Sequence, residues 1–144
     1  MDEREITVVD ALNEALREEL KRDPTVIIIG EDVASPIGED RHGTTGANKD
    51  LITEFGPERI RNTPISESAI IGSALGAALV GCRPVAELMF IDLIGVAMDQ
   101  IMNQVARNRY MFGGQSIAPL VIRTPGGGGS GAAGHHSASL EAML

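Results

Sequence analysis

Hydrophobic residues recur along the chain with two spacings, one typical of helices and one typical of strands. Apolar residues at positions 9, 12, 16 and 20 share one helical face, and Pro24 ends the segment. Thr7 and Asp10 have the spacing of an N-terminal capping box, with aspartate in place of the usual glutamate or glutamine. The pattern predicts an amphipathic helix between Thr7 and Pro24.

Short aliphatic runs alternate with the predicted helices. Residues 26–29 are one valine and three isoleucines without polar alternation, and Gly30 ends the run. Residues 84–89 and 119–123 are predicted strands of the same buried kind, and residues 59–62 fit a brief extended segment. Strands that are apolar on both faces usually lie inside a parallel sheet covered by helices.

The remaining helices are predicted from periodicity and composition. They are a short helix at 49–55, a helix rich in glycine and alanine at 66–80, a helix at 92–108 with apolar positions 94, 98, 101 and 105, and the first turn of a helix at 139–142. Residues 32–50 otherwise fit a loop. Alternating strands and helices predict an α/β fold with a mostly parallel sheet flanked by helices.

Length and charge exclude several classes of protein. The 144 residues suit one domain, and 12 basic against 20 acidic residues give a net charge of −8. Such an acidic chain disfavours nucleic acid as a partner. The longest apolar run, residues 69–82, is shorter than the roughly 18 residues of a membrane span. With Cys82 as the single cysteine, we expect a cytoplasmic protein without an internal disulfide or a membrane segment.

The 17 glycines of the chain are concentrated in a few places. Residues 126–131 match G-x-G-x-x-G after a predicted strand, but a dinucleotide site also needs a helix there and an acidic residue about 20 positions later. No Walker lysine is present either. A nucleotide-binding module therefore stays a minor alternative beside a flexible surface loop and a loop that closes over an active site.

Two polar residues stand out as candidates for chemistry. Glu67 opens the helix of small residues, whose interior glycines cost roughly 1 kcal/mol each unless another backbone or a ligand approaches closely. The structural alternative is that Ser66 caps this helix and Glu67 complements its dipole. His136 follows the glycine run and suits proton transfer or contact with an anion, or else it is a solvated residue without a role. The His135–His136 pair lacks a third ligand at the spacing of a zinc site.

Several segments, in order and nearly along the whole chain, resemble the beta subunit of the thiamine diphosphate-dependent 2-oxo acid dehydrogenase first component, of the pyruvate, branched-chain and acetoin types. The string from Glu87 to Gly114 looks closest to the acetoin type. The segments that carry the likeness are Gly30-Glu31-Asp32-Val33, Thr63-Pro64-Ile65-Ser66-Glu67, Arg83-Pro84-Val85-Ala86-Glu87-Leu88-Met89-Phe90, Met98-Asp99-Gln100-Ile101, Arg109-Tyr110-Met111-Phe112-Gly113-Gly114, Pro119-Leu120-Val121-Ile122-Arg123-Thr124-Pro125 and His136-Ser137.

The resemblance implies an architecture and a set of partners. Residues 1–144 are expected to form the transketolase-like pyrimidine-binding domain, cut near its C-terminal end, with the family's second domain absent. The implied enzyme is an α2β2 heterotetramer that binds thiamine diphosphate. Its alpha subunit supplies the diphosphate and Mg²⁺ site. A second beta subunit and the lipoyl-bearing acyltransferase component are the other implied partners.

The resemblance also implies roles for individual residues. Glu67 falls on the glutamate that activates the cofactor through its aminopyrimidine ring, and His136 on a histidine that assists acyl transfer to the lipoyl arm. Met89 and Leu93 fall on residues that line the pyrimidine pocket, although many relatives have an aromatic residue in place of Leu93. Leu120 falls on a residue whose backbone carbonyl binds a structural K⁺ in some members.

Two readings of function follow from the resemblance. The first is a catalytic contribution of Glu67 and His136 to a pyruvate-type, branched-chain-type or acetoin-type dehydrogenase. The second is a non-catalytic structural or interaction fragment, because half of the cofactor site belongs to the alpha subunit. The sequence does not decide between the three acyl substrates.

Overall fold

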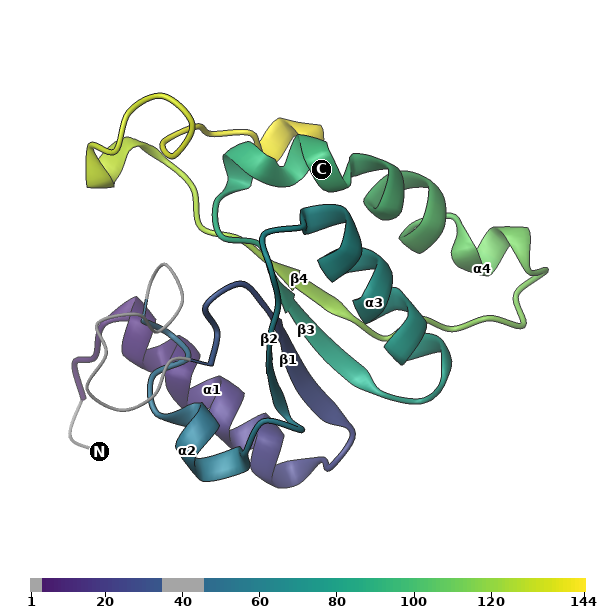
Figure 1. Ribbon diagram of the computed structural model, residues 1–144, viewed down its shortest axis with the longest axis horizontal. Helices are drawn as coiled ribbons and strands as arrows, with labels where there is room; N and C mark the ends of the chain where they lie inside the picture. Colours follow the sequence, from purple (N-terminus) through teal and green to yellow (C-terminus); the bar gives the residue numbers. More distant parts are fainter. Residues whose placement is uncertain (1–3, 35–45) are drawn as a thin grey trace.

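A computed structural model describes residues 4–34 and 46–144, and residues 35–45 of the predicted loop lie outside the described ranges. Four parallel strands form one sheet in the order β2-β1-β3-β4 (Figure 1). They are β1 (Val26–Gly30), β2 (Ile60–Asn62), β3 (Arg83–Glu87) and β4 (Val121–Arg123). The predicted α/β fold with a mostly parallel sheet is confirmed.

Helices cover both faces of this sheet (Figure 1). On one face lie α1 (Val8–Arg22) and α2 (Leu51–Phe55). On the other lie α3 (Glu67–Leu79), a 3-10 helix η1 (Ile91–Ala97), a π-helix η2 (Gln100–Val105) and α4 (Asn108–Met111). Two more 3-10 turns, η3 (Gly128–Ser130) and η4 (Glu141–Met143), follow β4. None of the helices in the described ranges has the length and apolar character that crossing a membrane requires.

The core consists of two apolar clusters, one on each side of the sheet. The cluster under α3 and η1 includes Ile70, Ile71 and Leu88. The cluster under α1 and α2 includes Leu20, Ile28 and Leu51 among other buried residues. Each cluster combines one helical face with one face of the sheet, which is the packing that a strand apolar on both sides requires.

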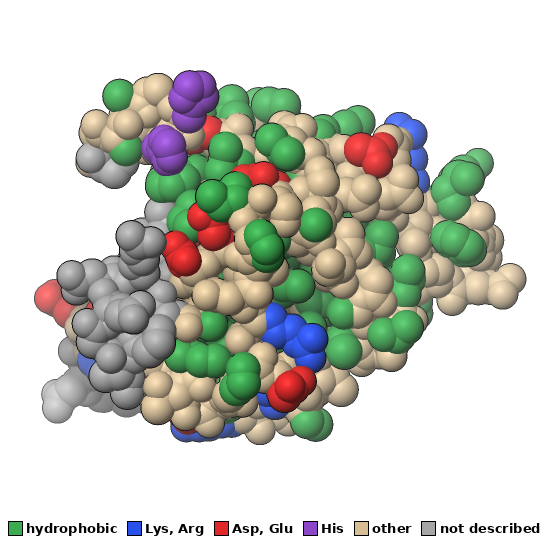
Figure 2. Space-filling model, in the orientation of Figure 1, with side chains coloured by type: hydrophobic (Ala, Val, Ile, Leu, Met, Phe, Trp, Pro, Cys, Tyr) green, Lys and Arg blue, Asp and Glu red, His purple; other side chains and the backbone are tan. Residues whose placement is uncertain are grey.

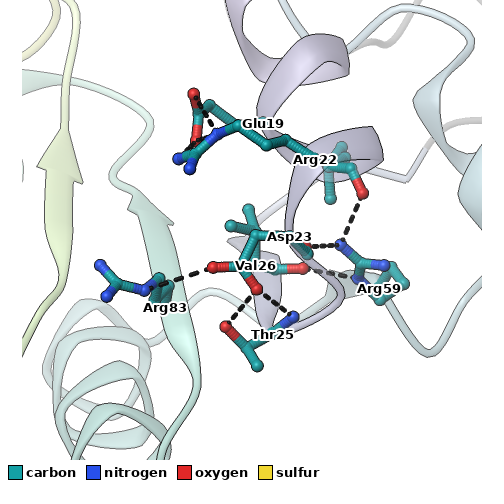
Figure 3. Close-up of polar contacts among 8 residues, drawn as sticks. Glu19, Arg22, Asp23, Thr25, Val26, Arg59 and Arg83 are labelled. Carbon is teal, nitrogen blue, oxygen red and sulfur yellow. Dashed lines mark hydrogen bonds and ion pairs between the residues drawn. The ribbon is translucent and has the colours of Figure 1, made fainter.

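The ends of α1 are held by side chains. The Thr7 hydroxyl oxygen accepts a hydrogen bond from the Asp10 backbone N–H at 3.1 Å, as the predicted cap requires. At the other end the Arg59 guanidinium donates to the carbonyl oxygens of Leu20 at 3.0 Å, Asp23 at 2.9 Å and Val26 at 2.5 Å (Figure 3). Arg59 thereby satisfies carbonyls that a helix end leaves without partners.

Asp23 joins α1 to the amino ends of the strands. Its carboxylate accepts hydrogen bonds from the Thr25 hydroxyl at 2.7 Å and the Thr25 N–H at 2.8 Å, and it pairs with Arg83 at 3.3 Å (Figure 3). The hydrogen bonds from Thr25 lower the pKa of the Asp23 carboxyl below its ordinary value, and the charge of Arg83 lowers it further. Asp23 and Arg59 thus have structural contacts at this amino edge of the sheet.

The predicted helix at 92–108 is confirmed as a helical segment, but it is not a regular α-helix. The segment begins as a 3-10 helix and continues as a π-helix, in which the Ala106 N–H donates to the Ile101 carbonyl at 2.9 Å. Near its start the Ser68 hydroxyl donates to the Val96 carbonyl at 2.6 Å. A side chain from α3 therefore donates a hydrogen bond to a backbone carbonyl of this segment. The spacing of apolar residues alone could not predict such a contact.

The predicted burial of the last strand is also wrong. β4 covers only residues 121–123 of the predicted 119–123, and Val121 is 58 % exposed. Within the described residues β4 pairs with β3 alone, so it is an edge strand. Its aliphatic composition is typical of a central strand, but composition alone does not predict how many strands pair with it.

Replacement of Gly76 by alanine is expected to stabilise the isolated chain by about 1 kcal/mol, because alanine is the better helix former. Gly76 lies inside α3, and a Cβ atom built there meets nothing within 4 Å. Gly72 is a matched control, since its Cβ would lie 3.2 Å from the Gln100 side-chain oxygen. Urea denaturation of both variants measures the difference; equal gains would contradict the distinction between the two glycines.

Candidate functional site

The candidate site lies where the strands end. In parallel sheets, ligands bind beyond the carboxyl ends of the strands, where neighbouring strands lead into crossovers in opposite directions. Here that position is between β1 and β3, since β1 leads toward β2 and β3 toward β4. The two backbones approach closely, because a Cβ on Gly30 would lie 2.6 Å from the Glu87 carbonyl oxygen. Glycine at position 30 permits this approach.

Glu67 is the first residue of α3 and reaches this edge because α3 follows β2. Its side chain is buried, at 7 % exposure. Within the described ranges no hydrogen bond or ion pair reaches its carboxyl group. The predicted cap from Ser66 is wrong, because the Ser66 hydroxyl donates instead to the Pro64 carbonyl at 3.3 Å. The helix end and dipole suit an acidic residue, as the structural alternative requires, and a carboxyl group without a partner there is also available to a ligand.

Glu31 is a second acidic residue at the same edge. It directly follows β1 and is half-buried. Burial raises the pKa of the Glu31 carboxyl, and the nearby charges of Asp32 and Glu67 raise it further. Sequence reasoning assigned Glu31 no role. The signal available was two successive acidic residues directly after a buried strand.

Met89 and Leu93 lie on the segment that continues from β3. Both are half-buried, Met89 just beyond the strand and Leu93 inside η1. The hydrogen bond from Ser68 to the Val96 carbonyl fastens η1 to the first turn of α3, which carries Glu67. The structure therefore brings the predicted pocket residues and the predicted catalytic carboxyl to the same end of the sheet.

His136 lies on the excursion between β4 and η4, which projects beyond the sheet (Figure 1). Its side chain is exposed, and both histidines of this excursion are visible on the surface (Figure 2). The imidazole packs against Phe90 with ring centroids 4.3 Å apart at 86°. In the described part of the chain, no hydrogen bond or ring contact joins His136 to Glu67. Each is nevertheless held near the segment that follows β3. His136 packs against Phe90, and α3, which carries Glu67, is joined to η1 through Ser68.

Leu120 lies at the opposite edge, just before β4 begins. With Pro119, Val121 and residues of α1, β1 and β3 it lines a cavity of about 420 Å³. The structure does not bring Leu120 to the site of Glu67, and its role toward K⁺ stays a prediction. No group of three or more His, Cys, Asp and Glu residues that could hold a metal ion occurs in residues 4–34 and 46–144.

A buried polar cluster, which the sequence analysis did not predict, lies at the carboxyl ends of β3 and β4. The Glu87 carboxylate, 2 % exposed, accepts a hydrogen bond from the Asn48 side-chain amide at 2.5 Å and pairs with the Arg123 guanidinium. The available signal was an acidic residue inside one otherwise apolar predicted strand, 84–89, and a basic residue at the end of another, 119–123. Their pairing follows from the register of β3 and β4, in which they are opposite one another.

Known proteins match nearly the whole chain. A 48 % identical relative is the acetoin:2,6-dichlorophenolindophenol oxidoreductase subunit beta of Cupriavidus necator, with 98 % of this chain and 43 % of that protein covered. The pyruvate dehydrogenase E1 component subunit beta of Staphylococcus epidermidis is 44 % identical, with 97 % and 42 % covered. The 2-oxoisovalerate dehydrogenase subunit beta of Bacillus subtilis is 41 % identical, with 96 % and 41 % covered. The chain thus spans about two fifths of the length of these relatives.

A solved structure shares the fold. It is titled as a split gene transketolase, inactive beta4 tetramer, and it superposes with a TM-score of 0.60 at 22 % identity, covering 89 % of this chain and 35 % of its own. The family described as transketolase, pyrimidine binding domain matches residues 4–144. The chain therefore belongs to the transketolase pyrimidine-binding domain family.

Proposed function

We propose that this chain is the pyrimidine-binding part of the beta subunit of a thiamine diphosphate-dependent 2-oxo acid or acetoin dehydrogenase. The relatives at 41–48 % identity are beta subunits of acetoin, pyruvate and 2-oxoisovalerate enzymes. The observation that carries the proposal is the position of Glu67, a residue that is only 7 % exposed in the first turn of α3, with a carboxyl group that has no hydrogen bond or ion pair among the described residues. A carboxyl group without a partner, close to where the strands of a parallel sheet end, is available to a ligand that binds at that edge.

The residues at this edge fit the aminopyrimidine ring of thiamine diphosphate. Such a ring needs one group that shares a proton with a ring nitrogen and apolar atoms that contact its faces. Glu67 offers the carboxyl group, and the half-buried Met89 and Leu93 offer apolar contact. Leucine at position 93 provides dispersion contact without aromatic stacking.

The proposed work of this chain is to bind, orient and hold a proton. Glu67 shares a proton with the pyrimidine nitrogen and so favours the tautomer that activates the cofactor. When bound, thiamine diphosphate would supply the chemistry that breaks the C–C bond next to the substrate carbonyl. Met89 and Leu93 keep water from the ring. His136, on its exposed excursion, assists transfer of the acyl unit to a lipoyl arm.

The rest of the site belongs to other chains in this proposal. The alpha subunit supplies the diphosphate and Mg²⁺ site, and a second beta subunit and the lipoyl-bearing acyltransferase component complete the assembly. The Leu120 carbonyl is proposed to contribute to a structural K⁺ site. We propose that residues 1–144 form one domain and that a second domain follows it in the whole subunit. We also propose that the enzyme is cytoplasmic.

A calorimetric titration of the 144-residue chain with thiamine diphosphate and Mg²⁺ separates the two readings of function. Because the diphosphate site is assigned to the alpha subunit, we expect no micromolar binding and no turnover by the chain alone. The full beta subunit, assembled with its alpha subunit, is expected to bind the cofactor and to cleave a 2-oxo acid or acetoin.

Two outcomes would contradict this proposal. Micromolar binding by the chain alone would show that no alpha subunit is needed for the site. An assembled complex that neither binds thiamine diphosphate nor cleaves any of the three substrate types would leave only the structural reading.

A further inference from the structure

The excursion that carries His136 is closed at its base by backbone hydrogen bonds. We call residues 126–138 the His136 loop. The Gly127 N–H donates to the Ala138 carbonyl at 2.8 Å, and the Ile91 N–H donates to the Pro125 carbonyl at 2.8 Å. Ala138 also packs against the core cluster under α3. Ala138, two residues after His136, is therefore the point at which the loop comes back to the core of the domain. We call it the return point of the loop.

Asp92 holds this return point with its side chain. Both carboxylate oxygens accept the Ala138 N–H, at 3.2 Å and 3.3 Å, in a partly buried setting. Hydrogen bonds to a carboxylate are stronger than neutral ones. Residues 92 and 138 are far apart in sequence, so this contact ties the loop to the first turn of η1.

The same short stretch contacts the imidazole. Phe90 lies two residues before Asp92 and makes the edge contact with His136. Between them, Ile91 fills the space under the loop: a Cβ at Gly126 would lie 2.7 Å from an Ile91 methyl group. Residues 90–92 thus contact the start of the loop, its histidine and its return.

We infer that Asp92 is a positioning residue for His136. Its carboxylate fixes the Ala138 amide, and the fixed return of the loop keeps the imidazole against Phe90 at the end of β3. The side-chain hydrogen bonds of Asp92 within the described residues go to Ala138 and not to Glu67, so Asp92 acts through the loop. This inference rests on the proposed role of His136 in acyl transfer.

The test compares Asp92→Ala and Asp92→Asn in the full beta subunit assembled with its alpha subunit. Asparagine keeps an oxygen that can accept the Ala138 N–H, and alanine does not. We expect Asp92→Ala to lower kcat for acyl transfer to a lipoyl acceptor by roughly tenfold or more, as misplaced catalytic groups do. The KM of the 2-oxo acid or acetoin should stay the same, and Asp92→Asn should restore most of kcat.

Hydrogen exchange on the 144-residue chain gives a second readout that does not depend on activity. The Ala138 amide should exchange faster in Asp92→Ala, while amides of β1 and β3 keep their protection. Glu58→Ala is the matched control, because it removes an exposed carboxylate that pairs only with the nearby Arg61 among the described residues. Unchanged exchange at Ala138, or equal loss of protection in β1 and β3, would overturn the positioning role.

The kinetic arms separate this inference from the proposed function. If Asp92→Asn is as impaired as Asp92→Ala, the contact with Ala138 is not what matters, and the inference fails. If His136→Gln transfers acyl groups normally, the role proposed for His136 fails, and with it the reason for positioning it. Faster exchange at Ala138 would then still show that Asp92 holds the loop.

Discussion

Glu67→Gln in the assembled enzyme is expected to lower turnover by about a hundredfold or more, the range in which general acid–base groups contribute. Glutamine keeps the size of the side chain but cannot share a proton with a ring nitrogen as a carboxyl group does. The loss should be in kcat, with assembly intact. Steady-state kinetics with a 2-oxo acid or acetoin, together with size-exclusion chromatography of the complex, measures both quantities.

The folded state of the chain should tolerate this replacement. Since Glu67 is buried and, within the described ranges, without a hydrogen-bond partner, a neutral amide breaks no contact there. We expect the thermal midpoint of the 144-residue Glu67→Gln chain to be equal to or above that of the unchanged chain. Glu58→Gln, at a side chain that is 91 % exposed, is the matched control for loss of a charge. Near-normal turnover in Glu67→Gln would refute the role of this residue.

The order and type of most elements could be predicted because each depends on local sequence. The Thr7 cap and the apolar stripe define α1, and uninterrupted aliphatic runs define β1 and β3. Where prediction failed, contacts between distant segments decided the outcome. The Ser68 hydroxyl engages η1, and β4 is an edge strand because of its place in the sheet.

The candidate site could be predicted only in part for the same reason. The sequence pattern indicates Glu67 and His136 as candidates, the resemblance implies their roles, and the topology explains why Glu67 reaches the carboxyl edge. Glu31, Asp92 and Glu87 matter through groups 36 or more positions away in the sequence: the like charge of Glu67 for Glu31, the Ala138 amide for Asp92 and the Arg123 guanidinium for Glu87. The sequence pattern shows each of these residues as an ordinary acidic residue. These long-range interactions become visible only in the folded structure.

Glu87→Ala is expected to lower the free energy of unfolding of the chain by about 3–5 kcal/mol, as removal of one partner of a buried ion pair does. The Arg123 side chain is 17 % exposed, and its Nε atom already has no partner among the described residues. Without Glu87, the Arg123 guanidinium loses its counterion and the buried Asn48 amide loses its acceptor. Urea denaturation followed by circular dichroism measures this loss.

A double replacement tests whether the loss comes from the orphaned charge. Glu87→Met combined with Arg123→Leu removes both ions and fills the space with apolar atoms, a change that is often neutral for buried ion pairs. We therefore expect the double variant to be more stable than Glu87→Ala. Glu58→Ala, which breaks an exposed pair with Arg61, should have a much smaller effect. If the double variant unfolds as easily as Glu87→Ala, the loss does not come from the orphaned Arg123 charge, and the Glu87–Arg123 pair itself stabilises the carboxyl edge of the sheet.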